Sequence, residues 1–262
     1  MGSATTQART ATARALAATS DVDLDVAREL FAAIGAVSGS AQLSGALSDS
    51  SVPADARTGL VSAVFGSSYR PATVAILAGA AQQRWSNSAE FIEGLEELAI
   101  RATSVAESAD IEAELFSFSR TVASNGELEL ALGGRMGDSS AKSALVSSLL
   151  EGRVSAGTAL IVTSLVSRAR GRRVRALLRR AERIVAEQRA RIVATVSTAA
   201  PLSADQQTRL QNALSARYGS AVTLNTVIDP TVLGGLRVQI ADDVIDASVS
   251  ARLADLRQRI AG

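Results

Sequence analysis

The stretch that decides the fold runs from residue 229 to residue 246 and reads Asp-Pro-Thr-Val-Leu-Gly-Gly-Leu-Arg-Val-Gln-Ile-Ala-Asp-Asp-Val-Ile-Asp. Leu236, Val238 and Ile240 alternate with polar residues, and this two-residue period predicts a strand with one apolar face. The glycine pair before the strand and the aspartates after it indicate turns. The segment that continues to Gly262 repeats apolar side chains at helical spacing. This order predicts a small hairpin packed under a C-terminal helix.

The preceding residues extend this prediction to a small α+β module. Residues 192–198 are rich in β-branched side chains, which favours a strand. Ser203, followed three residues later by Gln206, is typical of a capping box at the start of a helix. Residues 222–228 then alternate again and predict a further strand. We therefore expect residues 192–262 to form one module.

The rest of the chain is helical in pattern and contains an internal repeat with a period of 85 residues. Shifting the sequence by that amount superimposes apolar positions without a gap. The matched pairs include Leu30 with Leu115, Leu43 with Leu128, Leu47 with Leu132, Leu60 with Leu145 and Thr73 with Thr158. Chance similarity between two alanine-rich helical stretches is the alternative, but identical pairs in ungapped alignment favour a duplication.

The predicted fold class is therefore mainly α, with two tandem helical-bundle repeats followed by a small α+β C-terminal module. The expected domains are an N-terminal bundle at 1–105, a second bundle at 106–191 that ends in an arginine-rich helix, and the module at 192–262.

Composition removes several classes of function. The chain has no cysteine and no histidine, so it lacks thiolate metal ligands, the commonest general base and the commonest zinc ligand. The chain contains no run of about 18 apolar residues, which is the length that would predict a membrane span. Its first twenty residues do not resemble a secretory signal. We expect no catalytic residues, no cofactor and no metal.

Charge is unevenly placed, although the net charge is only +1. The segment from Glu90 to Glu114 holds eight acids and one base, and the segment from Arg168 to Arg191 holds ten arginines and two glutamates. The arginine-rich helix could bind nucleic-acid phosphates or anionic lipid headgroups. It lacks the interleaved aromatic residues that stack on bases, so we expect no nucleic-acid binding. A solvent-facing surface, or a partner for the acidic segment, is the alternative.

Isolated polar and aromatic candidates favour structural roles. The acids near the middle of the acidic segment are expected on an exposed helix face; they are Glu93, Glu96 and Glu97. The C-terminal aspartates fit turns and caps better than a metal site; they are Asp242, Asp243 and Asp246. Trp85, the only tryptophan, is expected to anchor a helix within the first bundle.

The C-terminal run from Ile228 to Leu256 resembles the signature of the delta subunit of F-type ATP synthase, a family that includes the mitochondrial oligomycin-sensitivity-conferring protein. The resemblance rests on two turns, a strand, a cap and a helix in fixed order. The family often has Gly where Ala247 stands and Arg-Gly where Ser250-Ala251 stand. The family is also similar in placing a helical bundle before a small α/β module, but this chain has an additional copy of the bundle.

The resemblance implies a non-catalytic subunit of the peripheral stalk of a proton-translocating ATP synthase, peripheral to the cytoplasmic face of the bacterial cell membrane. Such a subunit links the catalytic head to the b-subunit stalk and resists the torque of rotation. The bundle would receive the amphipathic N-terminal helix of an alpha subunit in a groove.

By the same resemblance, the groove would be lined by residues of the first and fifth helices: Arg14, Ala15, Val74, Leu77, Ala78 and Ala81. The second bundle offers an alternative groove at Ala159, Val162 and Thr163. The C-terminal module would bind the C-terminal end of the b subunit near Leu236, Val249, Leu253 and Leu256.

Overall fold

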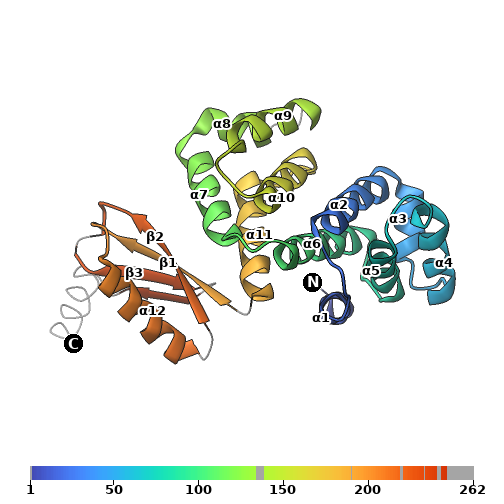
Figure 1. Ribbon diagram of the computed structural model, residues 1–262, viewed down its shortest axis with the longest axis horizontal. Coiled ribbons are helices and arrows are strands. Elements are labelled where there is room, and N and C mark those ends of the chain that lie inside the picture. Colours follow the sequence, from blue (N-terminus) through green and yellow to red (C-terminus); the bar gives the residue numbers. More distant parts are fainter. Residues whose placement is uncertain are drawn as a thin grey trace, which may run out of the picture. The chain divides into compact units, whose positions relative to one another are not determined.

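The computed structural model describes residues 2–133, 139–189, 191–218, 221–232, 234–240 and 243–246. The chain divides into two compact units, Met1–Val185 and Ala186–Gly262 (Figure 1). The first unit is built of helices and the second carries a small sheet. The predicted fold class, mainly α with a small α+β tail, is confirmed.

The first unit begins with six helices, and their starts follow local signals in the sequence. They are α1 (Ser3–Ala17), α2 (Leu24–Gly39), α3 (Ala41–Ser48), α4 (Ala54–Phe65), α5 (Pro71–Gln82) and α6 (Ser88–Ala106). Asp23 caps α2 by accepting hydrogen bonds from the amides of Asp25 and Val26. Pro71 opens α5, where its missing N–H costs nothing.

Five more helices are described after these: α7 (Ile111–Ser124), α8 (Gly126–Gly133), α9 (Ser139–Leu150), α10 (Ala156–Ser167) and α11 (Val174–Gln188). The helices α8, α9 and α10 begin and end 85 residues after α3, α4 and α5. The starts and ends of these helices thus repeat with the same 85-residue period as the sequence. The pair Asn125-Gly126 predicts only a turn, whereas Gly126 begins α8.

A glutamate repeats its role at this same spacing. Glu29 on α2 accepts hydrogen bonds from the amide of Arg70 at 3.0 Å and the hydroxyl of Thr73 at 2.5 Å, at the start of α5. Glu114 on α7 accepts from the amide of Ser155 at 3.0 Å and from its hydroxyl at 2.6 Å, at the start of α10. Each carboxylate thereby accepts a hydrogen bond from a backbone amide just before a helix. It also lies at the N-terminal end of that helix, which is the positive end of the helix dipole.

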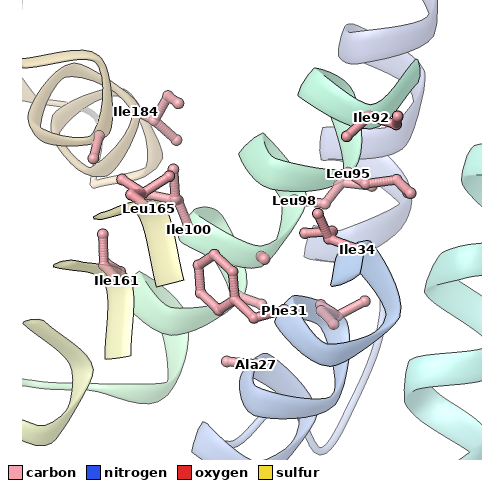
Figure 2. Close-up of a cluster of buried hydrophobic side chains, with 14 of the residues drawn as sticks. Ala27, Phe31, Ile34, Ile92, Leu95, Leu98, Ile100, Ile161, Leu165 and Ile184 are labelled. Atoms are coloured by element: carbon pink, nitrogen blue, oxygen red, sulfur yellow. The ribbon is translucent and has the colours of Figure 1, made fainter. Parts of the chain in front are cut away.

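Helix α6 is shared by both halves of the first unit. All seven residues from Gly94 to Ile100 are buried, and seven residues complete almost two turns, so no face of this stretch meets solvent. One side packs against α1, α2 and α3, and α10 packs on another. Figure 2 shows Phe31, Ile100, Ile161 and Ile184 within one buried cluster that joins α2, α6, α10 and α11. A continuous core therefore runs through the first unit. The boundary between two bundles at residue 105 stays a prediction.

The second unit holds a four-stranded sheet, with strand order β2-β1-β3-β4, and one described helix. Its elements are β1 (Arg191–Thr198), α12 (Ala204–Tyr218), β2 (Ala221–Ile228), β3 (Leu236–Ile240) and β4 (Asp243–Asp246). β1 and β2 are parallel and are connected through α12, whereas β3 is antiparallel to both β1 and β4. The helix lies on one face of the sheet (Figure 1).

Several sequence predictions for this unit are confirmed. Ser203 and Gln206 form the capping box, with reciprocal hydrogen bonds of 2.9 and 3.3 Å. Val238 and Ile240 are buried on one side of β3 while Arg237 and Gln239 are exposed on the other. Gly234 and Gly235 have φ angles of +68° and +82°, which L-residues with side chains rarely adopt. The predicted C-terminal helix lies outside the described residues.

Among the described helices, none is by itself long and apolar enough to cross a bilayer. Helices α2 and α3 meet that test only as a pair, and they are bent by 106° at their junction.

Candidate partner-binding surfaces

Glu96, in the middle of α6, is the centre of a buried ion-pair cluster. Its side chain is 3% exposed, and its carboxylate accepts hydrogen bonds from three arginines that follow α10 in the sequence. Arg170 donates at 2.6 Å, Arg172 donates twice at 2.8 Å, and Arg180 lies at 3.4 Å. Arg180 also donates to the backbone oxygen of Glu93 at 3.0 Å. The cluster therefore fastens α11 and the loop before it to α6.

The next acid, Glu97, extends this cluster to α1. Arg101 donates to Glu97 at 2.8 Å, and Arg9 of α1 lies 3.5 Å from Glu97 and 3.3 Å from Glu93. The expectation that Glu96 and Glu97 lie on an exposed face was wrong. They are buried because α6 is covered from both sides, which the sequence of one helix cannot show.

This cluster also accounts for part of the arginine-rich segment. Arg170, Arg172 and Arg180 are held by the acidic segment, as the alternative interpretation predicted. Arg175 forms a further pair with Glu129 of α8 at 2.9 Å. Arg173 and Arg179 are exposed. The charge blocks in the sequence were the signal for this pairing, but they could not identify the individual partners.

The arginines of the cluster differ in their electrostatic environment. Burial lowers the pKa of Arg180, and the charge of Glu96 offsets this effect only in part. For Arg172 burial acts in the same direction, but the hydrogen bonds and charge of Glu96 outweigh it and raise its pKa. Arg180 is the more buried of the two and the charge of Arg9 lowers its pKa further, whereas Arg172 makes the shorter, twofold contact with the carboxylate. Both guanidinium groups are thus charged partners of a buried carboxylate.

The predicted groove of the first bundle is only partly open. Arg14 and Ala15 are exposed on α1, and Val74 and Ala78 are half-buried on α5. α1 and α5 pack against each other, and the buried side of α1 carries Ala8, Thr12 and Leu16.

The other two residues predicted for this groove lie deeper. Leu77 is 3% exposed and Ala81 is fully buried, and both belong to the core cluster of the first unit. They support the surface from beneath, and a direct contact with a partner stays a prediction.

The alternative groove in the second bundle has a different setting. Ala159 and Thr163 are half-buried and Val162 is fully buried, much like their counterparts on α5. Among the helices that contact α10, α6 takes the place that α1 has beside α5, and α6 is buried along much of its length whereas α1 keeps exposed residues. The two candidate grooves therefore differ in their neighbouring helix rather than in α5 and α10.

Of the residues predicted to bind the b subunit, only Leu236 can be placed. It is half-buried at the start of β3 and packs against the core of the second unit. Val249, Leu253 and Leu256 lie outside the described residues.

Trp85 is buried, donates from Nε1 to the backbone oxygen of Ala80 at 2.9 Å, and meets the Phe91 ring edge-on at 5.7 Å between centroids. Its predicted anchoring role is confirmed. Within the described ranges, no group of three or more Asp, Glu, His or Cys side chains is placed to hold a metal ion.

Comparison with known proteins identifies the family. Residues 95–260 match the family model described as ATP synthase delta (OSCP) subunit. The chain belongs to this family. It is 48% identical to the ATP synthase subunit delta of Leifsonia xyli subsp. xyli over 265 residues, which covers 100% of both chains. It is 41% identical to that of Streptomyces avermitilis over 253 residues, covering 94% of this chain and 93% of the relative.

The extent of these matches bears on the duplication. The family match begins inside α6 and spans the second repeat and the second unit, so α1–α5 lie outside it. The Leifsonia delta subunit is matched over its whole length. The segment that holds α1–α5 therefore has a matching segment in this relative, and it precedes the part of the chain that the family model matches.

Proposed function

We propose that this chain is a non-catalytic subunit of the peripheral stalk of a proton-translocating ATP synthase. It would sit with the complex at the cytoplasmic face of a bacterial cell membrane and hold the catalytic head against rotation. The observation that carries the proposal is the full-length similarity to ATP synthase delta subunits. The family match over residues 95–260 supports the same assignment.

The construction of the first unit supports a mechanical role. A stator must transmit torque without deforming, and this requires helices that cannot slide past one another. In the first unit α6 belongs to one continuous core, and the Glu96 cluster adds directional hydrogen bonds from α11 and from the loop before it to α6. Close packing resists deformation, and directional ion pairs fix one arrangement of the two helices.

For contact with the head, the proposal is a helix-in-groove interaction at α1 and α5. The amphipathic N-terminal helix of an alpha subunit would meet Arg14, Ala15, Val74 and Ala78, with Leu77 and Ala81 forming the floor below. The exposure of the α1 residues supports this choice over the second bundle, where the neighbouring helix is covered.

For contact with the stalk, the proposal is that the C-terminal module binds the C-terminal end of the b subunit. Leu236 and the predicted helix with Val249, Leu253 and Leu256 would carry this contact. A separate unit for each partner lets the chain bind both at once.

The test is purification of a tagged chain from membranes of its native cells, with the bound proteins identified by mass spectrometry. Alpha, beta and b subunits of ATP synthase are expected in stoichiometric amounts. Deleting residues 229–262 should lose the b subunit while retaining the head. Recovery of neither the head nor the b subunit with the full-length chain would overturn the proposal.

A further inference from the structure

The two edges of the sheet in the second unit differ in how they are protected against pairing with a further strand. β4, at one edge, has four residues and begins and ends with aspartate. β2, at the other edge, has eight residues, and its sequence contains no charged residue, glycine or proline (Figure 1). Proteins usually protect an exposed edge with charges, proline or a very short strand. β4 has such protection, and β2 does not.

Three hydrogen bonds show which backbone groups of β2 face away from the sheet. The amide of Asp229, directly after the strand, donates to the backbone oxygen of Thr198 on β1 at 2.9 Å. At Val222 both backbone groups bond to α12 instead. The amide donates to Ser215 Oγ at 3.1 Å, and the oxygen accepts from Gln211 Nε2 at 2.8 Å. Because successive residues direct these groups to alternate sides of a strand, the even-numbered residues of β2 face outward.

The outward groups that follow Val222 are those of Leu224, Thr226 and Ile228, which we call the β2 outer edge. The α12 side chains take the place of a neighbouring strand at Val222 only. In the part of the chain that the structure describes, no hydrogen bond reaches the outward groups of the β2 outer edge. Ile228 is 41% exposed, and Leu224 and Thr226 are half-buried. The edge therefore has room for a strand of about five residues.

We propose that the β2 outer edge binds an extended segment of a partner, which adds a further strand to the sheet through backbone hydrogen bonds. This rests on the proposed function, in which the second unit binds the C-terminal end of the b subunit, and it makes that end the donor of the added strand. It also assigns β2 to the contact, in addition to Leu236 and the C-terminal residues.

The side chains that flank the edge define the chemistry of the added segment. On the side of the sheet that faces α12 they are Leu224 and Ile228, and on the opposite side they are Asn225 and Val227. None of them is charged, so a charged residue in the added strand would be buried there without a counter-charge. The segment is therefore uncharged over about five residues, with apolar side chains alternating toward Leu224 and Ile228.

The chain's own C-terminal residues do not fit this edge. They follow β4, which lies at the opposite edge of the sheet. Val249, Leu253 and Leu256 recur at helical spacing. A helix uses its backbone donors and acceptors internally and cannot pair with a strand.

The test is amide hydrogen exchange, measured by NMR on the full-length chain with and without a synthetic peptide of the C-terminal end of the cognate b subunit. In the free chain, the amides of Leu224 and Thr226 should exchange at least about tenfold faster than those of Thr223 and Asn225, which face β1. Saturating peptide should slow exchange at Leu224 and Thr226 at least about tenfold.

Thr226→Pro tests the same contact by affinity. It removes one outward N–H and leaves the bonds to β1, because proline is tolerated on an edge strand where its missing N–H would face solvent. Loss of this hydrogen bond, with the bulk of the ring, should weaken peptide binding about tenfold in calorimetric titration. The matched control, Thr226→Val, keeps the N–H and the branched shape and should bind within about twofold of the unmodified chain. Both variants should keep the circular dichroism spectrum.

Three outcomes would overturn the inference. The first is slow exchange at Leu224 and Thr226 in the free chain, which would mean that its own residues or a second copy already cover the edge; dilution would tell these two apart. The second is equal peptide affinity of Thr226→Pro and Thr226→Val. The third is failure of the peptide to bind. If the tagged chain still purified with the b subunit, the stalk assignment would stand and only the place of attachment would be wrong.

Discussion

The two repeats of the first unit share a backbone plan but join their last helix to their first by different chemistry. In the second repeat, Arg170, Arg172 and Arg180 surround Glu96. The residues 85 positions earlier are Trp85, Asn87 and Leu95. There Trp85 and Leu95 are buried, Asn87 caps α6, and Thr12, 84 positions before Glu96, bonds back to its own helix. Arg9 of α1 also pairs with Glu93 and Glu97 of α6. The first repeat is thus closed by apolar packing and one arginine, whereas the second is closed by three arginines around one buried carboxylate.

This difference shows how a duplicated bundle can divide its work. Apolar attraction is non-directional, whereas a carboxylate held by three guanidinium groups accepts few geometries. The first repeat keeps an exposed first helix, and the second has its first helix enclosed. We infer that the second repeat acts mainly as a brace and that the first presents the surface for a partner.

The largest expected effect tests whether the two repeats unfold as one body. Leu47→Ala and Leu132→Ala remove equivalent, fully buried leucines, and each is expected to lower the free energy of unfolding by about 2–5 kcal/mol. Because α6 is shared, both should shift the urea transition reported by Trp85 fluorescence, although Trp85 lies near the first repeat only. A Trp85 transition that moves with Leu47→Ala and stays in place with Leu132→Ala would show two independent bundles.

The control for this pair is Leu130→Ala on α8, whose side chain is 76% exposed. Its removal creates no cavity, so the unfolding free energy should change by less than about 0.5 kcal/mol.

The next largest effect tests the ion-pair cluster around Glu96. Glu96→Gln leaves three arginines facing a neutral amide, and we expect a loss of about 3 kcal/mol in unfolding free energy. Hydrogen exchange should accelerate in α11 more than in α4. The matched control, Glu129→Gln, breaks the more exposed pair with Arg175 and should cost less than about 1 kcal/mol. Equal losses in the two variants would mean that the cluster around Glu96 is not a special joint.

A smaller effect compares the repeated caps. Glu29→Gln and Glu114→Gln weaken the bonds at the starts of α5 and α10, and each should cost about 1 kcal/mol in unfolding free energy. The measurement is thermal unfolding by circular dichroism. Costs that differ several-fold between the two variants would contradict their equivalence.

The smallest effect is a dependence of stability on acid pH that arises from Asp23 in the first repeat. The backbone hydrogen bond from Val26, followed by the side-chain bond from Arg70, holds the pKa of Asp23 below its ordinary value of 3.8. A lowered folded-state pKa gives stability that is present above the ordinary value and is lost as pH falls through the lowered one. Asp23→Asn keeps a capping side chain and should flatten the acid limb of the stability profile, measured by urea unfolding between neutral and strongly acidic pH.

Arg70→Leu supplies the control for this effect, since it removes one of the two main causes of the shift. It should flatten the acid limb less than Asp23→Asn does. An acid limb that is as steep in Asp23→Asn as in the unmodified chain would contradict the assignment.

Much of the fold could be predicted from the sequence because its signals are local. The Ser203–Gln206 capping box, the alternation through Leu236 to Ile240 and the glycine pair at 234–235 depend on neighbours a few residues away. The 85-residue period was also visible, and it could have located α8, since Leu43 and Leu47 of α3 correspond to Leu128 and Leu132. The prediction of a turn at Gly126 relied on the local glycine signal and did not use this longer period.

The candidate surfaces were less predictable. A helical stripe that contains Leu77 and Ala81 looks the same whether it faces a partner or a core, and the structure places these two residues in the core. The exposure of Arg14 and the burial of Leu98 depend on which helices pack above them.

The sequence by itself determined the family, many of the helix starts and the 85-residue repeat, because these depend on local motifs, caps and periodicity. Only the tertiary structure decided that α6 serves both repeats and that Glu96 is buried among arginines from a segment more than 70 residues away. It also decided that α1, the first helix of the first repeat, keeps an exposed side, whereas α6, the first helix of the second repeat, is enclosed. The physical reason is that burial depends on what covers a side chain, and the covering helices here come from distant parts of the chain.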